Sequence, residues 1–545
     1  FEQRRVYVIQ GPRARKDAFP LKHPTQCLFA RLAAALLAVC LALSLAACGS
    51  GSNSFTWFVE DLPSNLDPQV ASAPADVIAC ENLYSGLVRK GADGQLKPAL
   101  AESWTLSADR RTYTFALKSG LTYTAAKGGA TTTAITAEDF VFAFRRLFRA
   151  ATASPYAVEF SAIENSAAVL AGLLPESSLG VEAQGELTLV FHLSEPDENF
   201  LQKLTLPGAM PCDEEFFNST RGTYGLSAAS TLSSGSFYLY NWTSSGLFLR
   251  RTPGGSLIGS LRLVQNTSNA DQSAAELLAN EKCSAALDET GAATSYQSIA
   301  YSDTTWSLLF NCDSVFSSTP LRQALASAAR TAAQSPDETL FAPAAGLIPT
   351  GLTVDGIDYR AAAGDPTPSL PDAAALYREA RQGLANSDFN HVTLLLPSGS
   401  GLTQAAEQIN GAWQKEFSLF FSMEEVEPEE FEKRLAAGDY TIALAPISAA
   451  SGSVYSVLAQ FTTQGGGLTG YPNALYATQL AASSTATGST RCSLLAECER
   501  QLLSDCAVVP LFAQQKRLLI ANGIQGLVFD PFGPVLDLTE TTRKK

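Results

Sequence analysis

Cys48 is the residue whose type and neighbours most directly suggest chemistry. The tetrapeptide Leu45-Ala46-Ala47-Cys48 ends an apolar run that begins at Leu32, directly after Arg31. The small residues before Cys48 fit a narrow peptidase pocket, and the thiol can take a diacylglyceryl group. A Gly- and Ser-rich stretch follows as a flexible tether. This pattern is typical of a bacterial lipoprotein signal and predicts export of the chain.

A membrane-spanning anchor is the alternative for the same run. Residues 32–47 number 16, whereas about 20 are needed to cross a bilayer. We therefore expect residues 1–47 to be a signal peptide, with a doubtful extension at its N-terminal end. Residues 48–54 are then a lipidated tether, and two acyl chains would hold the protein firmly to a membrane.

Hydrolysis by a secreted enzyme is a second chemistry, and the side chains give it little support. The motifs Gly-x-Ser-x-Gly, Ser-x-x-Lys and His-Glu-x-x-His do not occur. After residue 47 the histidines are His192 and His391, each in an alternating run that predicts a strand. Carboxylate pairs such as Glu429-Glu430 fall where charges are usually solvated. We expect no catalytic residues, and a lipid-anchored hydrolase stays only an alternative.

Seven cysteines follow Cys48, and no Cys-x-x-Cys pair is among them. A zinc site needs clustered ligands, which these cysteines and two scattered histidines do not offer. The scarcity of histidine also argues against a nickel or haem role, although arginine and aromatic side chains could still hold haem. We therefore expect no metal, no cofactor and buried free thiols, with one disulfide within residues 492–506 left open.

The chain is acidic, with a formal net charge of −15. Residues 1–47 carry seven basic and two acidic residues, so the remainder has a charge of −20. Such a surface repels nucleic acid and anionic lipid headgroups, which excludes nucleic acid as an expected partner. Hydrophobic residues make up 46% and charged residues 17%, a composition that favours several packed lobes over disorder.

Helix and strand patterns alternate along the chain and predict an α/β fold. Residues 112–118 alternate polar and apolar, and the sequence Thr136-Ala137-Glu138-Asp139 has the form of a capping box before an aromatic helical stripe. Pro428 opens a predicted helix that Gly438 closes, before a buried strand at residues 440–445. Residues 335–372 are rich in Pro, Gly and Ala, and predict loop and a surface excursion.

Further motifs occur in a fixed order along the chain. They begin with LDP at residues 66–68, NLYSGLV at 82–88 and DGQLKPALAESW at 93–104, and continue at residues 113–118, 135–146, 153–157, 179–181, 193–196, 234–239 and 507–511. Each alone is a turn, a strand or a capped helix. The ordered set resembles family 5 of the extracellular solute-binding proteins, the oligopeptide- and dipeptide-binding lipoproteins of ABC importers.

The resemblance implies a two-lobed, periplasmic-binding-protein-like fold of the large class, with an extra inserted domain and a strand hinge. The first lobe would comprise residues 49–84, 209–303 and 511–545, the inserted domain residues 85–208, and the second lobe residues 304–510. The lobes of such proteins close around a ligand held in the cleft between them.

The resemblance also implies candidate ligand contacts. Tyr156 matches a tyrosine that touches the ligand in oligopeptide-binding relatives, although a core or hinge tyrosine is an equal alternative. The segment Ser72-Ala73-Pro74 matches one whose backbone pairs with an extended peptide.

A third contact of the relatives is lost in this chain. The Asp that pairs with the peptide amine in those relatives falls on Ala450, and a Trp and an Arg nearby fall on Ile447 and Leu444. The loop keeps the Ser448 hydroxyl and backbone groups, but no charge. A buried ammonium without a counterion costs several kcal/mol, so a free peptide N-terminus should not bind there in the same manner.

Together these features predict a monomeric binding lipoprotein outside the cytoplasm, in the periplasm or on the outer face of the cell membrane. It would capture a small solute, foremost a peptide, and deliver it to an ABC permease and its ATPase subunits. A lipoprotein that senses a peptide signal would have the same fold and is the alternative.

Overall fold

The computed structural model describes residues 53–197, 199–251, 256–269, 271–292, 294–370, 372–450, 452–462, 467–532 and 535–544. These residues belong to one unit, Asn53–Lys545. Cys48 and the predicted signal peptide lie outside the described residues. Among the described helices, none has the length and apolar character needed to cross a membrane.

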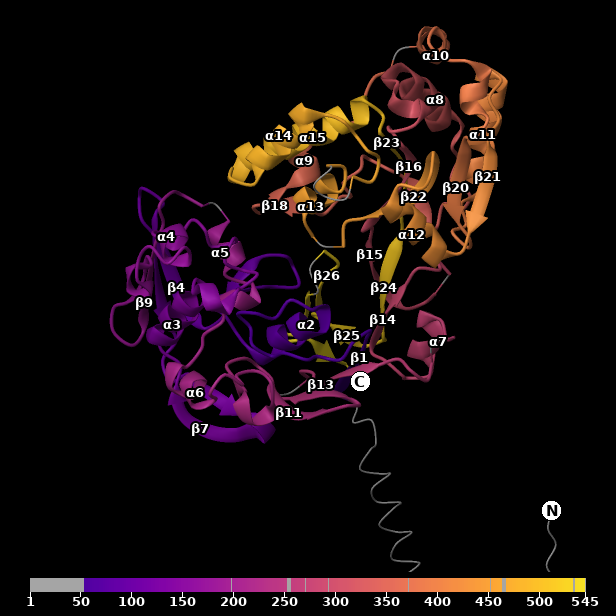
Figure 1. Cartoon of the computed structure of the whole chain (residues 1–545). Coiled ribbons are helices and arrows are strands. Elements are labelled where there is room, and N and C mark those ends of the chain that lie inside the picture. The colour runs from indigo at the N-terminus through magenta and orange to yellow at the C-terminus, as the bar shows by residue number, and fades with distance from the viewer. Residues whose placement is uncertain are drawn as a thin grey trace, which may run out of the picture. The chain divides into compact units, whose positions relative to one another are not determined.

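A six-stranded sheet organises the region between residues 304 and 514 (Figure 1). Its order is β17 (Phe341–Pro343), β23 (Val508–Gln514), β16 (Thr304–Phe310), β22 (Ile442–Ser448), β20 (Thr393–Pro397) and β21 (Ser422–Val426). Alternate side chains of β16 enter two different cores, and the whole strand is buried.

Helices cover both faces of this sheet. One core includes residues of α8 (Thr319–Ala332), α10 (Ala373–Arg381) and α11 (Thr403–Phe417). The other includes residues of α9 (Tyr359–Ala363), α13 (Val454–Ala459), α14 (Ala474–Ser483) and α15 (Gly488–Ser504). Burial on both faces explains why β20 and β22 are nearly continuous apolar runs.

Two strands continue from this sheet into a three-stranded sheet. β15 (Gln297–Tyr301) leads through residues 302 and 303 into β16, and β23 leads through residue 515 into β24 (Lys516–Ile520). β24 pairs antiparallel with β15 and with β14 (Ala285–Asp288), so the two connections run side by side (Figure 1). This arrangement matches the predicted strand hinge between lobes.

Segments from both ends of the chain share another core. The sheet order is β1 (Ser54–Val59), β13 (Ser260–Gln265), β12 (Gly246–Arg250) and β11 (Tyr238–Thr243), with β1 parallel to β13. Asn82 in α2 (Pro74–Leu83) donates to the Leu536 carbonyl at 2.7 Å and accepts from the Leu538 amide at 3.0 Å. The lobe boundaries themselves stay predictions.

The predicted capping box is confirmed at the start of α3 (Ala137–Leu147). The Asp139 carboxylate accepts from the Thr136 amide at 2.6 Å, and Phe140 and Phe144 are fully buried. Burial raises the pKa of Asp139 to about 6, although the hydrogen bonds from Thr136 act against this shift. The helix packs with the sheet β4 (Ala101–Leu106), β5 (Thr112–Leu117), β9 (Thr188–His192) and β8 (Val181–Ala183).

The remaining elements are short or peripheral. They are β2 (Val88–Lys90), β3 (Leu96–Pro98), β6 (Thr122–Ala125), β7 (Gly129–Ala134), α4 (Ser166–Leu170), α5 (Phe200–Lys203), α6 (Glu214–Ser219), β10 (Leu232–Ser233), α7 (Ala274–Ala279), β18 (Thr353–Val354), β19 (Ile357–Asp358), α12 (Pro428–Ala437), β25 (Ile524–Gln525), β26 (Val528–Asp530), β27 (Val535–Asp537) and β28 (Thr542–Arg543).

The local predictions are largely confirmed. α12 begins at Pro428 and ends before Gly438, whose φ is 68°. The strand prediction for His391 is wrong, because this residue lies in a turn, before β20 begins, and is exposed. All seven described cysteines are buried and unpaired, so no disulfide forms within residues 492–506.

The predicted surface excursion at residues 335–372 is wrong in its central part. Leu347, Ile348 and Tyr359 are fully buried there. The cause is Glu499 of α15, a carboxylate with no exposed surface. It accepts from the Leu347 and Ile348 amides at 3.0 and 3.1 Å, from the Tyr359 hydroxyl at 2.8 Å and from the Arg360 guanidinium at 2.8 Å.

We predict that Glu499→Gln lowers the free energy of unfolding by about 2 to 4 kcal/mol, because one acceptor oxygen becomes an amide that faces buried donors. Urea titration followed by circular dichroism measures the change. Glu497→Gln is the matched control, since Glu497 lies on the same helix in an exposed pair with Arg500. Equal midpoints for the two variants would contradict the role given to Glu499.

Candidate ligand-binding site

Tyr156 and the 72–74 segment (Ser72, Ala73 and Pro74) lie together in the structure. The Tyr156 hydroxyl donates to the Ala71 carbonyl at 2.6 Å, directly before Ser72. The Tyr156 side chain is half-buried, and this burial raises its pKa well above the usual value. The phenol therefore stays a neutral donor, and its oxygen can still accept a hydrogen bond from a ligand.

The backbone of the 72–74 segment is open to a partner. All three residues are exposed, and Ala73 has an extended backbone (φ −67°, ψ 142°) as the N-cap of α2. Within the described part of the chain, the amides of Ser72 and Ala73 make no hydrogen bond, whereas the Ala71 amide donates to Asp67. Extended backbone with unused donors is what an added strand requires.

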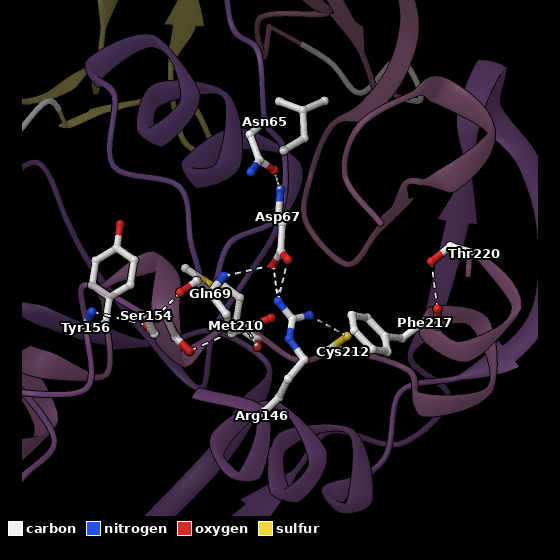
Figure 2. A network of polar contacts seen from close by, with 12 residues as sticks. Asn65, Asp67, Gln69, Arg146, Ser154, Tyr156, Met210, Cys212, Phe217 and Thr220 are labelled. Carbon is white, nitrogen blue, oxygen red and sulfur yellow. Dashed lines mark hydrogen bonds and ion pairs between the residues drawn. The ribbon is translucent and has the colours of Figure 1, made fainter. Parts of the chain in front are cut away.

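Side chains from distant parts of the sequence hold the residues that precede this segment (Figure 2). The Ser154 hydroxyl donates to the Gln69 carbonyl at 2.6 Å. The Gln69 side chain, which is fully buried, donates to the Met210 carbonyl at 2.9 Å. Residues 69–71 are therefore fixed from both sides, and they set the position of the 72–74 segment.

A buried ion pair lies at the base of this network. Figure 2 shows the Arg146 guanidinium between the Asp67 carboxylate and the Cys212 thiol, which is 3.5 Å away. The side chains of Arg146 and Asp67 are 2% and 11% exposed. Burial lowers the pKa of Arg146, but the Asp67 carboxylate outweighs that effect and raises it, so Arg146 stays charged. Burial also raises the pKa of Asp67 in spite of Arg146, which shows that this carboxylate is costly to bury as an anion. The ring of Phe217 lies 4.6 Å from the guanidinium and covers it.

The predicted loop is wrong in its first part, because Ile447 and Ser448 are the last two residues of β22 and pair with β16. Ala450 lies in the loop that follows the strand. The Ile447 side chain is only 1% exposed and belongs to the core of α13–α15, whereas Ser448 and Ala450 are exposed. The Ala450 amide donates to the Ser448 hydroxyl at 3.2 Å. The loop thus offers backbone and a hydroxyl, while Ile447 presents no side chain to solvent.

Gly452 brings this loop against another part of the chain. Its φ is 70°, and a Cβ atom at this position would lie 2.0 Å from the Phe532 carbonyl oxygen. Only glycine fits such a position, because both the backbone conformation and the space exclude a side chain. Phe532 lies two residues beyond β26, which pairs with β27, so the loop is held beside this pair of strands.

Charged residues beneath the loop were missed by sequence reasoning. The Ala449 amide donates to the Asp303 carbonyl at 2.7 Å. The Asp303 carboxylate and Glu289 lie 3.0 and 2.9 Å from the Lys516 ammonium. Burial lowers the pKa of Lys516, and the two carboxylates raise it overall. Three residues so distant in sequence carry no shared motif, and only the pairing of β24 with both β14 and β15 brings them together.

The predicted contacts therefore form two groups. Tyr156 lies with the 72–74 segment, and Ser448 and Ala450 lie with Asp303. Across the described ranges, no hydrogen bond or ion pair joins the two groups. Their role as ligand contacts stays a prediction. The described residues also contain no group of His, Cys, Asp and Glu that could hold a metal ion.

The family is established by a match over residues 95–468 to the model of bacterial extracellular solute-binding proteins, family 5 (middle region). The chain belongs to this family, as the order of its motifs predicted.

Curated relatives match shorter stretches. The chain is 32% identical over 182 residues to the Escherichia coli protein named "Probable deoxycholate-binding periplasmic protein YgiS", covering 33% of each chain. It is 34% identical over 136 residues to the periplasmic oligopeptide-binding protein OppA of Haemophilus influenzae, covering 25% of this chain and 24% of the relative. The aligned stretches thus span a third or less of these relatives.

A solved structure matches almost the entire described chain. It is the substrate-binding domain of an oligopeptide ABC transporter from Bacillus anthracis, with a TM-score of 0.61 and 22% identity. The match covers 90% of this chain and 99% of that one. It confirms the predicted two-lobed α/β fold.

We predict that Arg146→Met lowers the free energy of unfolding by about 3 to 5 kcal/mol, because it leaves the Asp67 charge buried and unpaired. The double variant Asp67→Asn with Arg146→Met should lose less of the free energy of unfolding, since no unpaired charge is then buried. The control is Arg149→Met, whose ion pair with Glu176 is more than a third exposed and is worth at most about 1 kcal/mol. Differential scanning calorimetry compares the three, and equal effects of Arg146→Met and Arg149→Met would refute the prediction.

Proposed function

We propose that this protein captures a solute outside the cytoplasm, foremost a peptide, and delivers it unaltered to an ABC import permease driven by ATPase subunits. The observation that carries the proposal is the exposed 72–74 segment, whose amides are unused and whose position Tyr156 fixes. Backbone pairing tolerates any side chain, which suits a ligand of variable sequence. Family membership and the oligopeptide-binding relatives support the same assignment.

Capture by lobe closure requires contacts from both lobes, because only differential contact with the closed state can shift the equilibrium. Tyr156 and the 72–74 segment would supply one side, and the exposed Ser448 and Ala450 the other. A diacylglyceryl group on Cys48 would hold the monomeric protein to the outer face of a membrane, near the permease. No catalytic step is part of this function.

A second class of ligand is favoured by one feature of the loop. Ala450 stands where peptide-binding relatives have a carboxylate. A ligand without a free amine therefore loses no binding energy from the absence of that carboxylate. An amphipathic solute that is not a peptide fits this difference, and one relative is named for deoxycholate binding. A peptide sensor would use the same site, and it would differ only in giving no stimulation of ATPase activity in a reconstituted transporter.

The ligand is best identified by native mass spectrometry of the lipid-free chain after gentle purification. We expect a bound peptide mass that is lost on partial unfolding, and a smaller radius of gyration by small-angle X-ray scattering when the same peptide is added back. A bound bile-acid-like mass would select the second class. Turnover of the bound molecule by the pure protein would overturn the proposal of a binding protein.

We predict that Ala450→Asp raises the affinity for peptides with a free N-terminus by roughly tenfold, because it restores a charge-assisted contact to the amine. N-acetylated peptides should gain nothing. Ala374→Asp, on the exposed face of α10, adds the same charge elsewhere and serves as the control. Isothermal titration calorimetry gives the affinities, and equal gains for acetylated and free peptides would show that Ala450 does not face the amine.

A further inference from the structure

A pocket in the region of the six-stranded sheet contains an arginine with no partner. The pocket has a volume of about 210 Å³ and lies between α8, the β17–β23 edge and the end of α15. Arg330, in the last turn of α8, lines it. Within the described ranges, Arg330 makes neither an ion pair nor a hydrogen bond, although its side chain is partly buried and burial lowers its pKa.

The surroundings of Arg330 do not satisfy its guanidinium. The C-terminal end of α8 offers a partly negative dipole, but the guanidinium has five N–H donors to place. Asp365 acts on it only through space, and the Asp365 carboxylate instead accepts from the Thr367 amide at 2.8 Å. The guanidinium therefore lines the pocket without a protein acceptor, and a carboxylate there could take two of its N–H groups in place of water.

The other walls of the pocket indicate what else the anion carries. Most are apolar and come from Ala333, Pro343, Leu503, Pro510, Leu511 and Phe512. The Ser335 hydroxyl already donates to the Phe341 carbonyl at 2.7 Å, so it has no proton left for a ligand. The site therefore offers one cationic fork, further polar surface that includes Thr367, and apolar side chains on the other walls. That combination suits a monoanion with a short hydrocarbon tail better than a multiply charged phosphate, which needs several donors.

We infer that this pocket binds a small carboxylate with a short apolar tail through Arg330. The site lies apart from the residues of the proposed function, because neither Tyr156 nor the 72–74 segment lines it, and neither Ser448 nor Ala450 does. It is a second ligand site on the protein, and its occupancy should not depend on the captured solute.

The test uses butyrate as probe and butyramide as its neutral analogue, with the full processed chain in low-salt buffer. Saturation-transfer NMR and calorimetry should show that butyrate binds, and that butyramide binds at least tenfold more weakly. Arg330→Gln should abolish butyrate binding, and Arg330→Lys should weaken it, because lysine keeps the charge but loses the bidentate fork. Arg378→Gln, an exposed arginine on α10, makes the same charge change and should bind butyrate like the unaltered chain.

Stability provides an independent readout without any ligand. Because Arg330 is unpaired, Arg330→Gln should unfold at the same or a higher temperature than the unaltered chain, and it should retain the ligand of the proposed site. Equal binding of butyrate and butyramide, undiminished butyrate binding by Arg330→Gln, or tighter binding of inorganic phosphate than of butyrate would each overturn the inference. Failure of the proposed peptide function would leave these results unchanged.

Discussion

The pairing of Arg146 with Asp67 is the constraint on which the first group of candidate contacts depends. Arg146 belongs to α3, in the predicted inserted domain, and Asp67 belongs to the segment that leads to α2. Such a pair adds little net stability compared with apolar packing. It nevertheless favours one arrangement of the two segments, because separating the charges would leave each of them buried without a counterion. It thereby fixes the start of the stretch whose later carbonyls receive Ser154 and Tyr156.

The strands that connect the two sheets also depend on a charged pair. Lys516 lies where β23 passes into β24, and it is neutralised by Asp303 on the adjacent connection. The same Asp303 backbone receives the Ala449 amide. The loop that lacks a carboxylate at position 450 therefore rests on a strand junction that carries its own ammonium and carboxylates. A movement of the lobes at this junction would therefore displace the loop.

Local chemistry was predictable where it is written in neighbouring residues. The capping box at Thr136, the helix between Pro428 and Gly438 and the apolar strands follow from spacing alone. The family and its fold followed from the order of motifs. The buried part of residues 335–372 was not predictable, since its order depends on Glu499, which lies more than 130 residues away in sequence. Arg330 was missed for a related reason, because the sequence does not reveal whether an arginine has an ion-pair partner in the folded chain.

The seven buried thiols have a consequence for how the molecule reaches its native state. Each is shielded in the folded chain, where burial keeps the thiol protonated and inert. An unfolded chain entering an oxidising compartment would expose all of them, and a crosslink between two of them would be absent from the native structure, in which all seven are free. The chain must therefore fold faster than its thiols oxidise. The yield of correctly folded protein should then depend strongly on the redox conditions during synthesis, whereas the stability of the folded protein should depend on them less.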